Sequence, residues 1–374
     1  MTSPAENMRI LITGGAGFIG SNLAITLKSR LPSARVVSMD NLYRRGSEMN
    51  LSRLKAHGVL FHHGDVRKPG DFPSGPFDVL AECSAEPSVL AGIDQSPEYL
   101  VESNLLGAFH CLEKARLWRS GFLFLSTSRI YPIQRLESHP WREEANRFMW
   151  EDQGTPGISS KGVSELLDMS GTRSLYGFTK YAAEQLIGEY RSAYGLTAVV
   201  NRCGVIAGPW QFGKIDQGVA ALWVLGHHFR QPLSYIGYGG LGKQVRDFLH
   251  IEDLCELIAR QISELDRWDG WVGNVSGGAS NAASLRDLTV HCRECVGNEV
   301  PIASKVENRP GDLASLLETA LAYLSVLSGD HDVTCALSFK TLPYGCANIR
   351  RPCRAAWSSR DFFKNAQRCH SCTG

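Results

Sequence analysis

The sequence predicts an α/β protein with a doubly wound parallel sheet and a smaller C-terminal α/β lobe. Two observations predict it. Short apolar runs alternate with segments of helical periodicity, and this alternation indicates right-handed crossovers between parallel strands. Apolar runs such as GFLFL have no polar interruption, which is typical of strands covered on both faces.

The first strand and helix are predicted within MRILITGGAGFIGSNLAITLKSR. An apolar run ends at Ile12, and apolar residues recur at helical spacing after a glycine-rich turn. Glycines there let the backbone turn sharply and approach a pyrophosphate, which the helix N-terminus then faces. This is the pattern of a Rossmann-like dinucleotide site, and its predicted cofactor residues are Gly14, Gly17, Phe18, Ile19 and Gly20.

The second strand, ARVVSMD, ends in Asp40, twenty residues after Gly20. An acidic side chain there accepts hydrogen bonds from ribose hydroxyls and repels a 2′-phosphate, which favours NAD over NADP. Arg44 and Arg45 follow closely and weaken that preference. We expect NAD as the cofactor, with Asn41 beside Asp40 in its site.

Three more strands are predicted in order. GVLFHHGDV ends near Asp65, FDVLAECSAEP forms the fourth strand, SPEYLVESNLLGAFHCLEKARLW forms a helix, and GFLFLSTSRIY forms the fifth strand. Ligands in such sheets lie beyond the carboxyl ends of the strands. Asp65 and Val66 therefore join the predicted cofactor residues, and Thr127 terminates the fifth strand at the same edge.

A tyrosine and a lysine stand four apart in SLYGFTKYAAEQ, so Tyr176 and Lys180 share one face of a predicted helix. The helix follows an insertion and should pack beside the fifth strand. A free tyrosine has a pKa of about 10, and a nearby cation favours the phenolate. Thr127 would hold a substrate hydroxyl, Tyr176 would remove its proton, and Lys180 would supply the charge and bind ribose hydroxyls.

With these motifs in order, the chain resembles the extended branch of the short-chain dehydrogenase/reductase family, the NAD-dependent sugar-nucleotide epimerases and dehydratases. The likeness covers roughly residues 8–312 and rests on TGGAGFIG, the threonine after the fifth strand and Y-x-x-x-K. It implies catalytic roles for Thr127, Tyr176 and Lys180, and a bracing role for Asn104. It also implies a homodimer that packs through the tyrosine helix and its neighbour.

Two stretches, GPWQFGKIDQGVAALWV and GLGKQVRDFLHIEDL, resemble the CDP-paratose (CDP-tyvelose) 2-epimerases, which act at carbon 2 of a CDP-linked dideoxyhexose. STSRIY and the insertion before the tyrosine fit the same subgroup. The resemblance implies a nucleotide-sugar substrate, with Gln211 and Gln217 at its sugar end. Arg246 would hold the pyrophosphate as a guanidinium fork, and Arg309 would grip the nucleotide.

Dehydration is disfavoured by the same resemblance. Dehydratases place an acidic pair directly after the strand-five threonine, because eliminating water needs a further acid and base. Here those positions hold Ser128 and Arg129. Three alternatives stay open: a UDP-sugar 4-epimerase, another NAD(P)-dependent nucleotide-sugar oxidoreductase, and a non-catalytic NAD-binding protein.

Three regions are predicted along the chain. Residues 1–205 form the NAD-binding domain, and residues 206–312 form mainly the substrate lobe, with some elements returning to the first domain. Residues 313–374 form an atypical basic tail that holds five of the eleven cysteines. This tail departs abruptly from the family pattern, and either out-of-frame coding sequence or a lineage-specific extension accounts for it.

Composition excludes several classes of function. A net charge of +1 argues against a nucleic-acid or membrane-surface binder. The start, MTSPAENMRI, has no signal-peptide pattern, so we expect a cytoplasmic protein with reduced thiols. The two C-x-x-C pairs, Cys292/Cys295 and Cys369/Cys372, lie too far apart for a compact zinc site, and we expect no metal.

Overall fold

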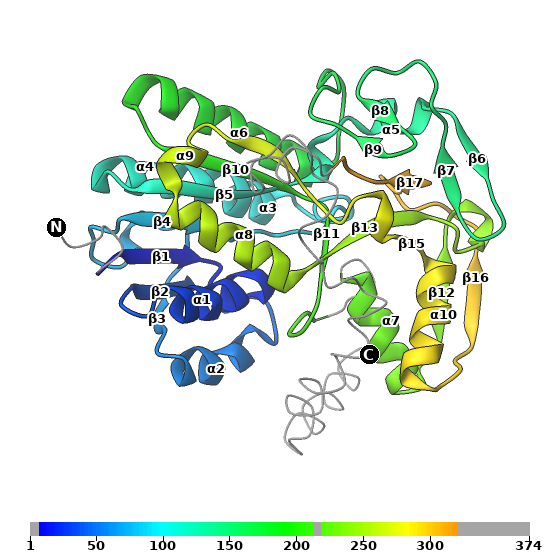
Figure 1. Ribbon diagram of the computed structural model, residues 1–374, viewed down its shortest axis with the longest axis horizontal. Coiled ribbons are helices and arrows are strands. Elements are labelled where there is room, and N and C mark those ends of the chain that lie inside the picture. The colour runs from blue at the N-terminus through cyan, green and yellow to red at the C-terminus, as the bar shows by residue number, and fades with distance from the viewer. Residues whose placement is uncertain (1–6, 213–217, 320–374) are drawn as a thin grey trace.

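The computed structural model describes residues 7–212 and 218–319. Their largest sheet has seven strands in the order β14-β10-β5-β4-β1-β2-β3 (Figure 1). Every neighbouring pair is parallel, and the chain winds outward in both directions from β1, so the predicted Rossmann-like sheet is confirmed. The strands are β1 (Arg9–Thr13), β2 (Arg35–Asp40), β3 (Leu60–His63), β4 (Val79–Glu82), β5 (Gly121–Thr127), β10 (Ala198–Cys203) and β14 (Val272–Val275).

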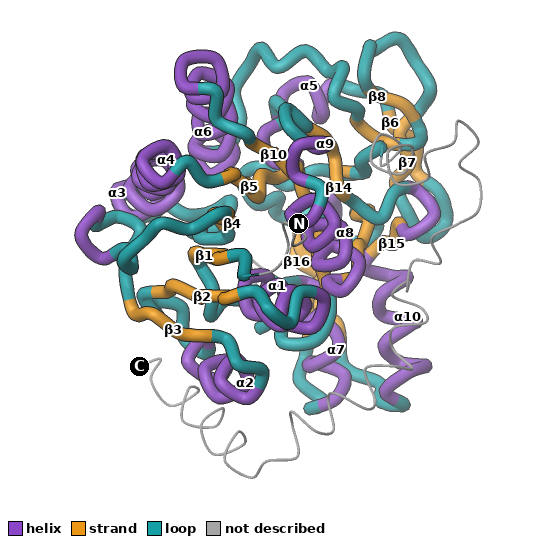
Figure 2. The backbone as a smooth tube through the Cα atoms, turned by 60° about the vertical axis from the view of Figure 1, so that its left-hand side comes forward, coloured by secondary structure: helices purple, strands orange, loops and turns teal. Residues whose placement is uncertain are grey.

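Helices cover both faces of this sheet (Figure 2). Side chains alternate along a strand, so Ile10 and Ile12 enter one core while Leu11 enters the other. The first core is closed by α1 (Phe18–Arg30), α2 (Asn50–Ala56), α8 (Ile251–Ser263) and α9 (Leu265–Trp268). On the opposite face lie α3 (Glu98–Val101), a π-helical turn (Glu102–Leu106), α4 (Gly107–Trp118) and α6 (Leu175–Tyr194).

A second lobe is built around β13 (Val245–His250). This strand pairs with β11 (Val205–Ala207), β15 (Ala282–Ser284) and β17 (Ser315–Leu316). A two-stranded sheet of β12 (Leu233–Ile236) and β16 (Ile302–Lys305) lies with α7 (Val219–His228) and α10 (Leu285–Val296) in the same lobe (Figure 1). Between β13 and β15 the chain returns to the large sheet through α8 and β14, because both pack there.

The segment between β5 and α6 folds over the junction of the two lobes. It contains α5 (Ile133–Ser138), the hairpin β6 (Trp141–Glu143) and β7 (Phe148–Trp150), and the pair β8 (Ile158–Ser159) and β9 (Gly162–Val163). Its core includes Tyr131 and Trp150, which pack in one cluster with Leu313. Single 3-10 turns occur at Ser47–Met49, Pro69–Asp71, Ser128–Ile130, Tyr238–Gly240 and Ala279–Asn281.

Residues 313–319, which the sequence places at the start of the tail, pack into the second lobe. Leu313, Leu316 and Leu317 are buried, and β17 runs parallel to β13. The rest of the predicted tail, with Cys369 and Cys372, lies outside the described residues. Residues 313–319 thus belong structurally with the strands that precede them.

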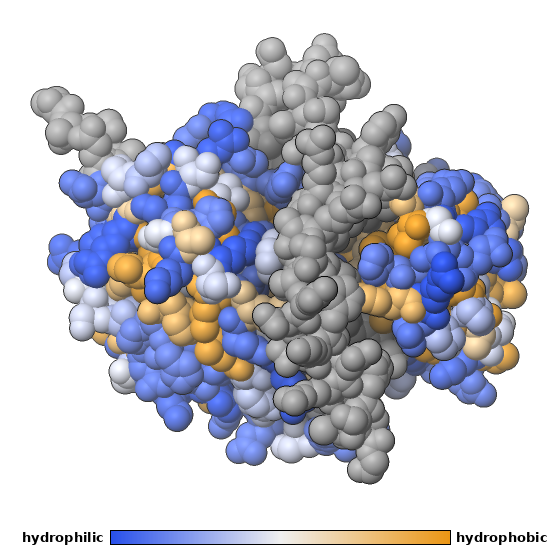
Figure 3. Space-filling model, turned by 90° about the horizontal axis from the view of Figure 1, so that it is seen from below, coloured by the Kyte–Doolittle hydropathy of each residue, from blue (hydrophilic) through white to orange (hydrophobic). Residues whose placement is uncertain are grey.

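The surface seen in Figure 3 is largely hydrophilic, with smaller apolar areas between polar side chains. Among the helices of the described ranges, none combines the length and the apolar character that crossing a bilayer requires.

An ion pair is buried between the large sheet and α6. Arg202 on β10 donates from Nη2 to Oε2 of Glu184 at 2.8 Å, and the two side chains are only 10% and 3% exposed. Ser126 also donates to Glu184. Burial lowers the pKa of Arg202, but the pairing with Glu184 outweighs burial and raises it. The network joins strands β5 and β10 to the helix that carries Tyr176 and Lys180.

We expect Arg202→Met to lower the free energy of unfolding by about 3–5 kcal/mol, because the Glu184 carboxylate is then buried without a counter-ion. Chemical denaturation of the purified protein measures this loss. Arg30→Met is the matched control, since its pair with Glu256 is exposed and such pairs contribute little. Equal losses in both variants would contradict the structural role given to the buried pair.

Candidate active site

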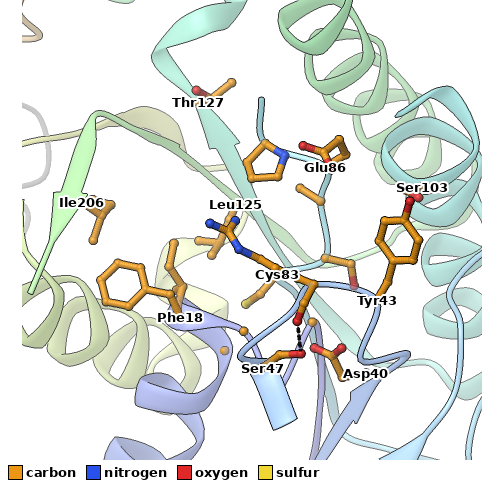
Figure 4. A pocket seen from close by; sticks show the side chains of 18 of the residues that line it. Phe18, Asp40, Tyr43, Ser47, Cys83, Glu86, Ser103, Leu125, Thr127 and Ile206 are labelled. Atoms are coloured by element: carbon orange, nitrogen blue, oxygen red, sulfur yellow. Dashed lines mark hydrogen bonds between the residues drawn. The ribbon is translucent and has the colours of Figure 1, made fainter. Parts of the chain in front are cut away.

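One cavity of about 660 Å³ lies at the carboxyl ends of the central strands. Its lining includes the loops after β1, β2 and β4 and the last residues of β5 and β10. In Figure 4, Asp40 and Thr127 lie toward opposite ends of this cavity. The parallel sheet therefore gathers the ends of several strands around one elongated ligand site, as predicted for this kind of sheet.

The glycine turn after β1 leaves bare backbone against the cavity. Gly14 has φ +63°, and a Cβ there would lie 2.7 Å from the carbonyl oxygen of Cys83. A Cβ on Gly20 would overlap the carbonyl oxygen of Gly14, so α1 packs directly on the turn. The amide of Ala16 is 3.0 Å from Oδ2 of Asp40 and donates to it. The N-terminus of α1 thus faces the space where an anionic ligand is favoured.

Asp40 ends β2 and lines the cavity. Burial raises the pKa of Asp40, while backbone N–H donors, among them those of Leu42 and Ala16, partly oppose that rise. Arg44 and Arg45 line the same cavity. A carboxylate and two guanidinium groups therefore meet in one ligand site, as the sequence indicated.

Asp65 and Asn41 form a second polar group in the lining. Asn41 donates from Nδ2 to Oδ2 of Asp65 at 3.0 Å, and Arg67 donates from Nη2 to the same oxygen at 2.7 Å. Burial raises the pKa of Asp65, but the hydrogen bonds from Arg67 and Asn41 outweigh it and lower the pKa to about 2. Asp65 is therefore an ionised acceptor beside Val66, which also lines the cavity.

The structure brings Thr127, Tyr176 and Lys180 together in the same lining. Thr127 is the last residue of β5, and the other two lie one turn apart on α6. Oγ1 of Thr127 accepts from the backbone N–H of Arg129 at 3.2 Å. Burial raises the pKa of the Tyr176 phenol, while Lys180, Thr127 and Arg129 each oppose the rise. Lys180 thus lowers the pKa of the phenol, but the effect of burial is larger.

Sequence reasoning missed the partner of the lysine. Nζ of Lys180 lies 3.3 Å from Oε2 of Glu82, and the two side chains are 3% and 1% exposed. The same ammonium lies 4.2 Å from the ring centre of Phe124. Glu82 closes β4, whose sequence is VLAE. An acidic residue at the end of an otherwise apolar strand was the available signal for it.

Asn104 links the loop after β4 to α6. Its Oδ1 accepts from the backbone N–H of Glu86 at 2.8 Å, and its Nδ2 donates to the Glu86 carbonyl at 3.0 Å and to Oγ1 of Thr179 at 3.3 Å. Thr179 precedes Lys180 on α6. Asn104 lies in the π-helical turn and is not part of the cavity lining, whereas Glu86 is.

The residues predicted for substrate binding lie in different places. Gln211 lines the cavity and donates to the Ile206 carbonyl at 2.8 Å. Arg246 and Arg309 do not line it, and both pair with Asp312, at 2.9 and 3.4 Å. Gln217 lies outside the described residues.

Arg129 faces the cavity beside Tyr176. Its Nη1 donates to the Gly311 carbonyl at 3.0 Å, which connects the end of β5 to the second lobe. Burial, followed by repulsion from Arg246, lowers the pKa of Arg129 to about 10. The position after Ser128 thus carries a cation.

No group of three or more histidine, cysteine, aspartate or glutamate side chains is placed to hold a metal ion within residues 7–212 and 218–319. Cys292, one of the cysteines of the predicted C-x-x-C pairs, is buried in α10.

Comparisons with known proteins agree with this geometry. The profile described as the NAD dependent epimerase/dehydratase family matches residues 10–272. CDP-paratose 2-epimerase of Salmonella typhi is 31% identical over 300 residues, which are 75% of this chain and 82% of that protein. UDP-glucose 4-epimerase of Halalkalibacterium halodurans is 28% identical over 331 residues, 84% of this chain and 87% of that protein.

A solved structure supports the fold. The chain is similar to UDP-glucose 4-epimerase of Thermus thermophilus in complex with NAD, with a TM-score of 0.67 and 24% identity. The match covers 92% of this chain and 99% of that chain.

Proposed function

The chain belongs to the NAD-dependent epimerase/dehydratase family, and on this premise we propose that it epimerises a nucleotide-linked sugar, with a CDP-sugar inverted at carbon 2 as the first candidate. The meeting of Thr127, Tyr176 and Lys180 in one cavity with the glycine turn carries the proposal. The similarity to CDP-paratose 2-epimerase supports the choice of candidate.

NAD is the cofactor of the family, and the cavity fits it. Gly14 and Gly20 leave backbone where a side chain would collide, and Asp40 offers acceptors toward a ribose. Oγ of Ser84 is buried in the lining without a hydrogen-bond partner in the described residues. When bound, NAD supplies the reversible oxidation that inversion at a sugar carbon requires.

The side chains at the Thr127 end of the cavity transfer the proton of the sugar hydroxyl. Thr127 orients a sugar hydroxyl through its own hydroxyl, in the cavity that Tyr176 also lines. Tyr176 takes the proton from that oxygen as the carbon becomes a ketone, and returns it after the keto-sugar has turned its other face. Lys180 would stabilise the phenolate in this cycle and would bind the ribose hydroxyls of the cofactor.

Arg129 supports epimerisation over dehydration. Elimination of water needs an acid and a base in addition to the tyrosine. At the position directly after Ser128 the structure has the guanidinium of Arg129, which donates to the Gly311 carbonyl.

The substrate diphosphate is proposed to bind near Arg246 and Arg309. These two guanidinium groups share one carboxylate, Asp312, so the group keeps an excess of positive charge. Gln211 and Gln217 are both proposed to bind the sugar end of the substrate.

A homodimer in the cytoplasm is proposed as the working form. Several large apolar side chains on α4 and α6 are exposed, and burying them would stabilise a helix-to-helix interface. They are Phe109, Leu117, Phe178 and Tyr194.

A UDP-sugar 4-epimerase is the second candidate. Its support is the similarity to UDP-glucose 4-epimerase over 84% of the chain. The chemistry at Thr127 and Tyr176 is the same in both candidates, and only the position of the reacting carbon differs.

The function is tested by incubating the purified protein, without added cofactor, with CDP-paratose, UDP-glucose and UDP-glucuronate while NMR follows each sugar's stereochemistry. Denaturing a second sample shows whether NAD was bound. We expect bound NAD and inversion of CDP-paratose at carbon 2. Inversion of a UDP-sugar at carbon 4 would replace the first candidate by the second, and bound NAD with no turnover in the panel would reject both.

A further inference from the structure

Glu82 is a buried acid that the chemistry described above does not use. It is the last residue of β4 and lies opposite Thr13 of β1 and Phe124 of β5 in the sheet. Leu80, two residues earlier, belongs to the core beneath α4 and α6, so Glu82 points to the same face. The lysine of α6 meets it there at 3.3 Å.

The surroundings of Glu82 contain few charges. The titratable groups near it are Lys180 from α6, Cys83 directly after β4 and Cys111 from α4. Burial raises the pKa of Glu82, and the charge and hydrogen bond of Lys180 oppose that rise, as does the backbone N–H of Ser84. Lys180 is thus the cation that Glu82 meets in this part of the core.

Lys180 is in turn the link to the phenol. Besides Lys180, the titratable groups that face Tyr176 are Cys203 from β10 and Arg129 from the turn after β5. The ammonium therefore acts on both the Glu82 carboxylate and the Tyr176 phenol, in a site where charges interact more strongly than in water.

We propose that Glu82 is a positioning residue that fixes the Lys180 ammonium over Phe124 and neutralises part of the charge that reaches Tyr176. This inference rests on the proposed function, because it assigns Glu82 a role in the proton transfer of that site. It acts through Lys180 and makes no contact with substrate.

Two physical arguments support the role. A lysine side chain has four flexible methylene groups, and a 3.3 Å contact with a buried carboxylate limits where its ammonium can lie. A carboxylate beside an ammonium also weakens the field of that ammonium at a third group. Glu82 thereby fixes the position of the Lys180 ammonium and reduces the stabilisation that this ammonium gives to the phenolate.

The test measures Tyr176 directly. The phenolate of the NAD-loaded protein is titrated by ultraviolet difference spectroscopy against the Tyr176→Phe variant, so that only Tyr176 contributes. In Glu82→Gln the midpoint of the Tyr176 titration is expected to move to lower pH by about one unit. The carboxylate that offsets the Lys180 ammonium is then gone, and an opposite charge such as this ammonium, within a few ångströms of a titrating group, shifts its pKa by one unit or more. The measurement needs no sugar, so absence of turnover, which would reject the proposed function, leaves this result readable.

Glu184→Gln is the matched control. It removes a buried carboxylate from the same helix that carries Lys180, and Glu184 binds Arg202 instead. Glu184 lies eight residues from Tyr176, about 12 Å along the helix. The Tyr176 titration midpoint of the Glu184→Gln variant should therefore stay within a few tenths of a unit of the parent's. An equal shift in both variants would overturn the proposal.

Glu82→Asp tests the same idea if the glutamine variant does not fold. Aspartate keeps the negative charge, but its shorter side chain holds that charge farther from Lys180. The Tyr176 midpoint of this variant should therefore lie between those of the parent and the glutamine variant. An unchanged midpoint in Glu82→Gln, or one that rises in either variant, would overturn the proposal.

Discussion

Replacing Tyr176 with phenylalanine is expected to lower kcat for sugar epimerisation by about 10²- to 10⁴-fold, the usual contribution of a positioned acid–base group. The phenol is the proton carrier of the site, and its removal leaves Thr127 and Lys180 with no group to take the proton. The cavity keeps its shape, since only one oxygen is lost. Bound NAD should therefore stay at the parent's level.

Tyr190→Phe is the control for this prediction. It removes the same oxygen from the same helix, where Tyr190 donates to Oε1 of Glu113 at 2.6 Å, outside the cavity lining. Its kcat should match that of the parent. A Tyr176→Phe enzyme that keeps more than a tenth of the parent's kcat would contradict the assignment of the proton carrier.

The second large effect is expected at the glycine turn. Gly20→Ala should weaken NAD binding at least tenfold and lower the free energy of unfolding by about 1–3 kcal/mol, the usual cost of forcing an extra methyl group into a packed site. The added methyl group overlaps the Gly14 carbonyl, so α1 must move away from the turn. Titration calorimetry with NAD and chemical denaturation measure the two losses.

Gly188→Ala provides the comparison. Gly188 lies inside α6, and a Cβ there has no atom within 4 Å outside its own helix. We expect it to gain about 0.5–1 kcal/mol, because alanine loses less backbone entropy than glycine in a helix. Parent-like NAD affinity in Gly20→Ala would mean that the turn does not contact the pyrophosphate.

Much of the site was predictable because its pieces are local in sequence. The glycine turn, Asp40 and the end of β5 at Thr127 each follow from a short pattern of apolar and polar residues. The topology of a parallel sheet then brings these strand ends to one edge. The four-residue spacing of Tyr176 and Lys180 places both on one face of α6 by helix geometry alone.

Other contacts join residues that no short pattern connects. Glu82 and Lys180 are 98 residues apart, and Arg246 and Asp312 are 66 apart. The placement of residues 313–319 beside β13 is equally remote, since it depends on a strand pairing across the second lobe. Such contacts are decided by packing of the whole chain, so sequence patterns could name the arginines but not the carboxylate that holds them.

The proposed oxidation and reduction at one sugar carbon is tested most directly with the nucleotide sugar that the panel shows to be inverted, labelled with deuterium at that carbon. The protein is incubated with it in ordinary water without added NAD, and NMR follows the label. We predict that the inverted product keeps its deuterium, because the carbon is oxidised and reduced within one site. Inversion with loss of deuterium to water would contradict this mechanism, since that result requires removal of the hydrogen as a proton.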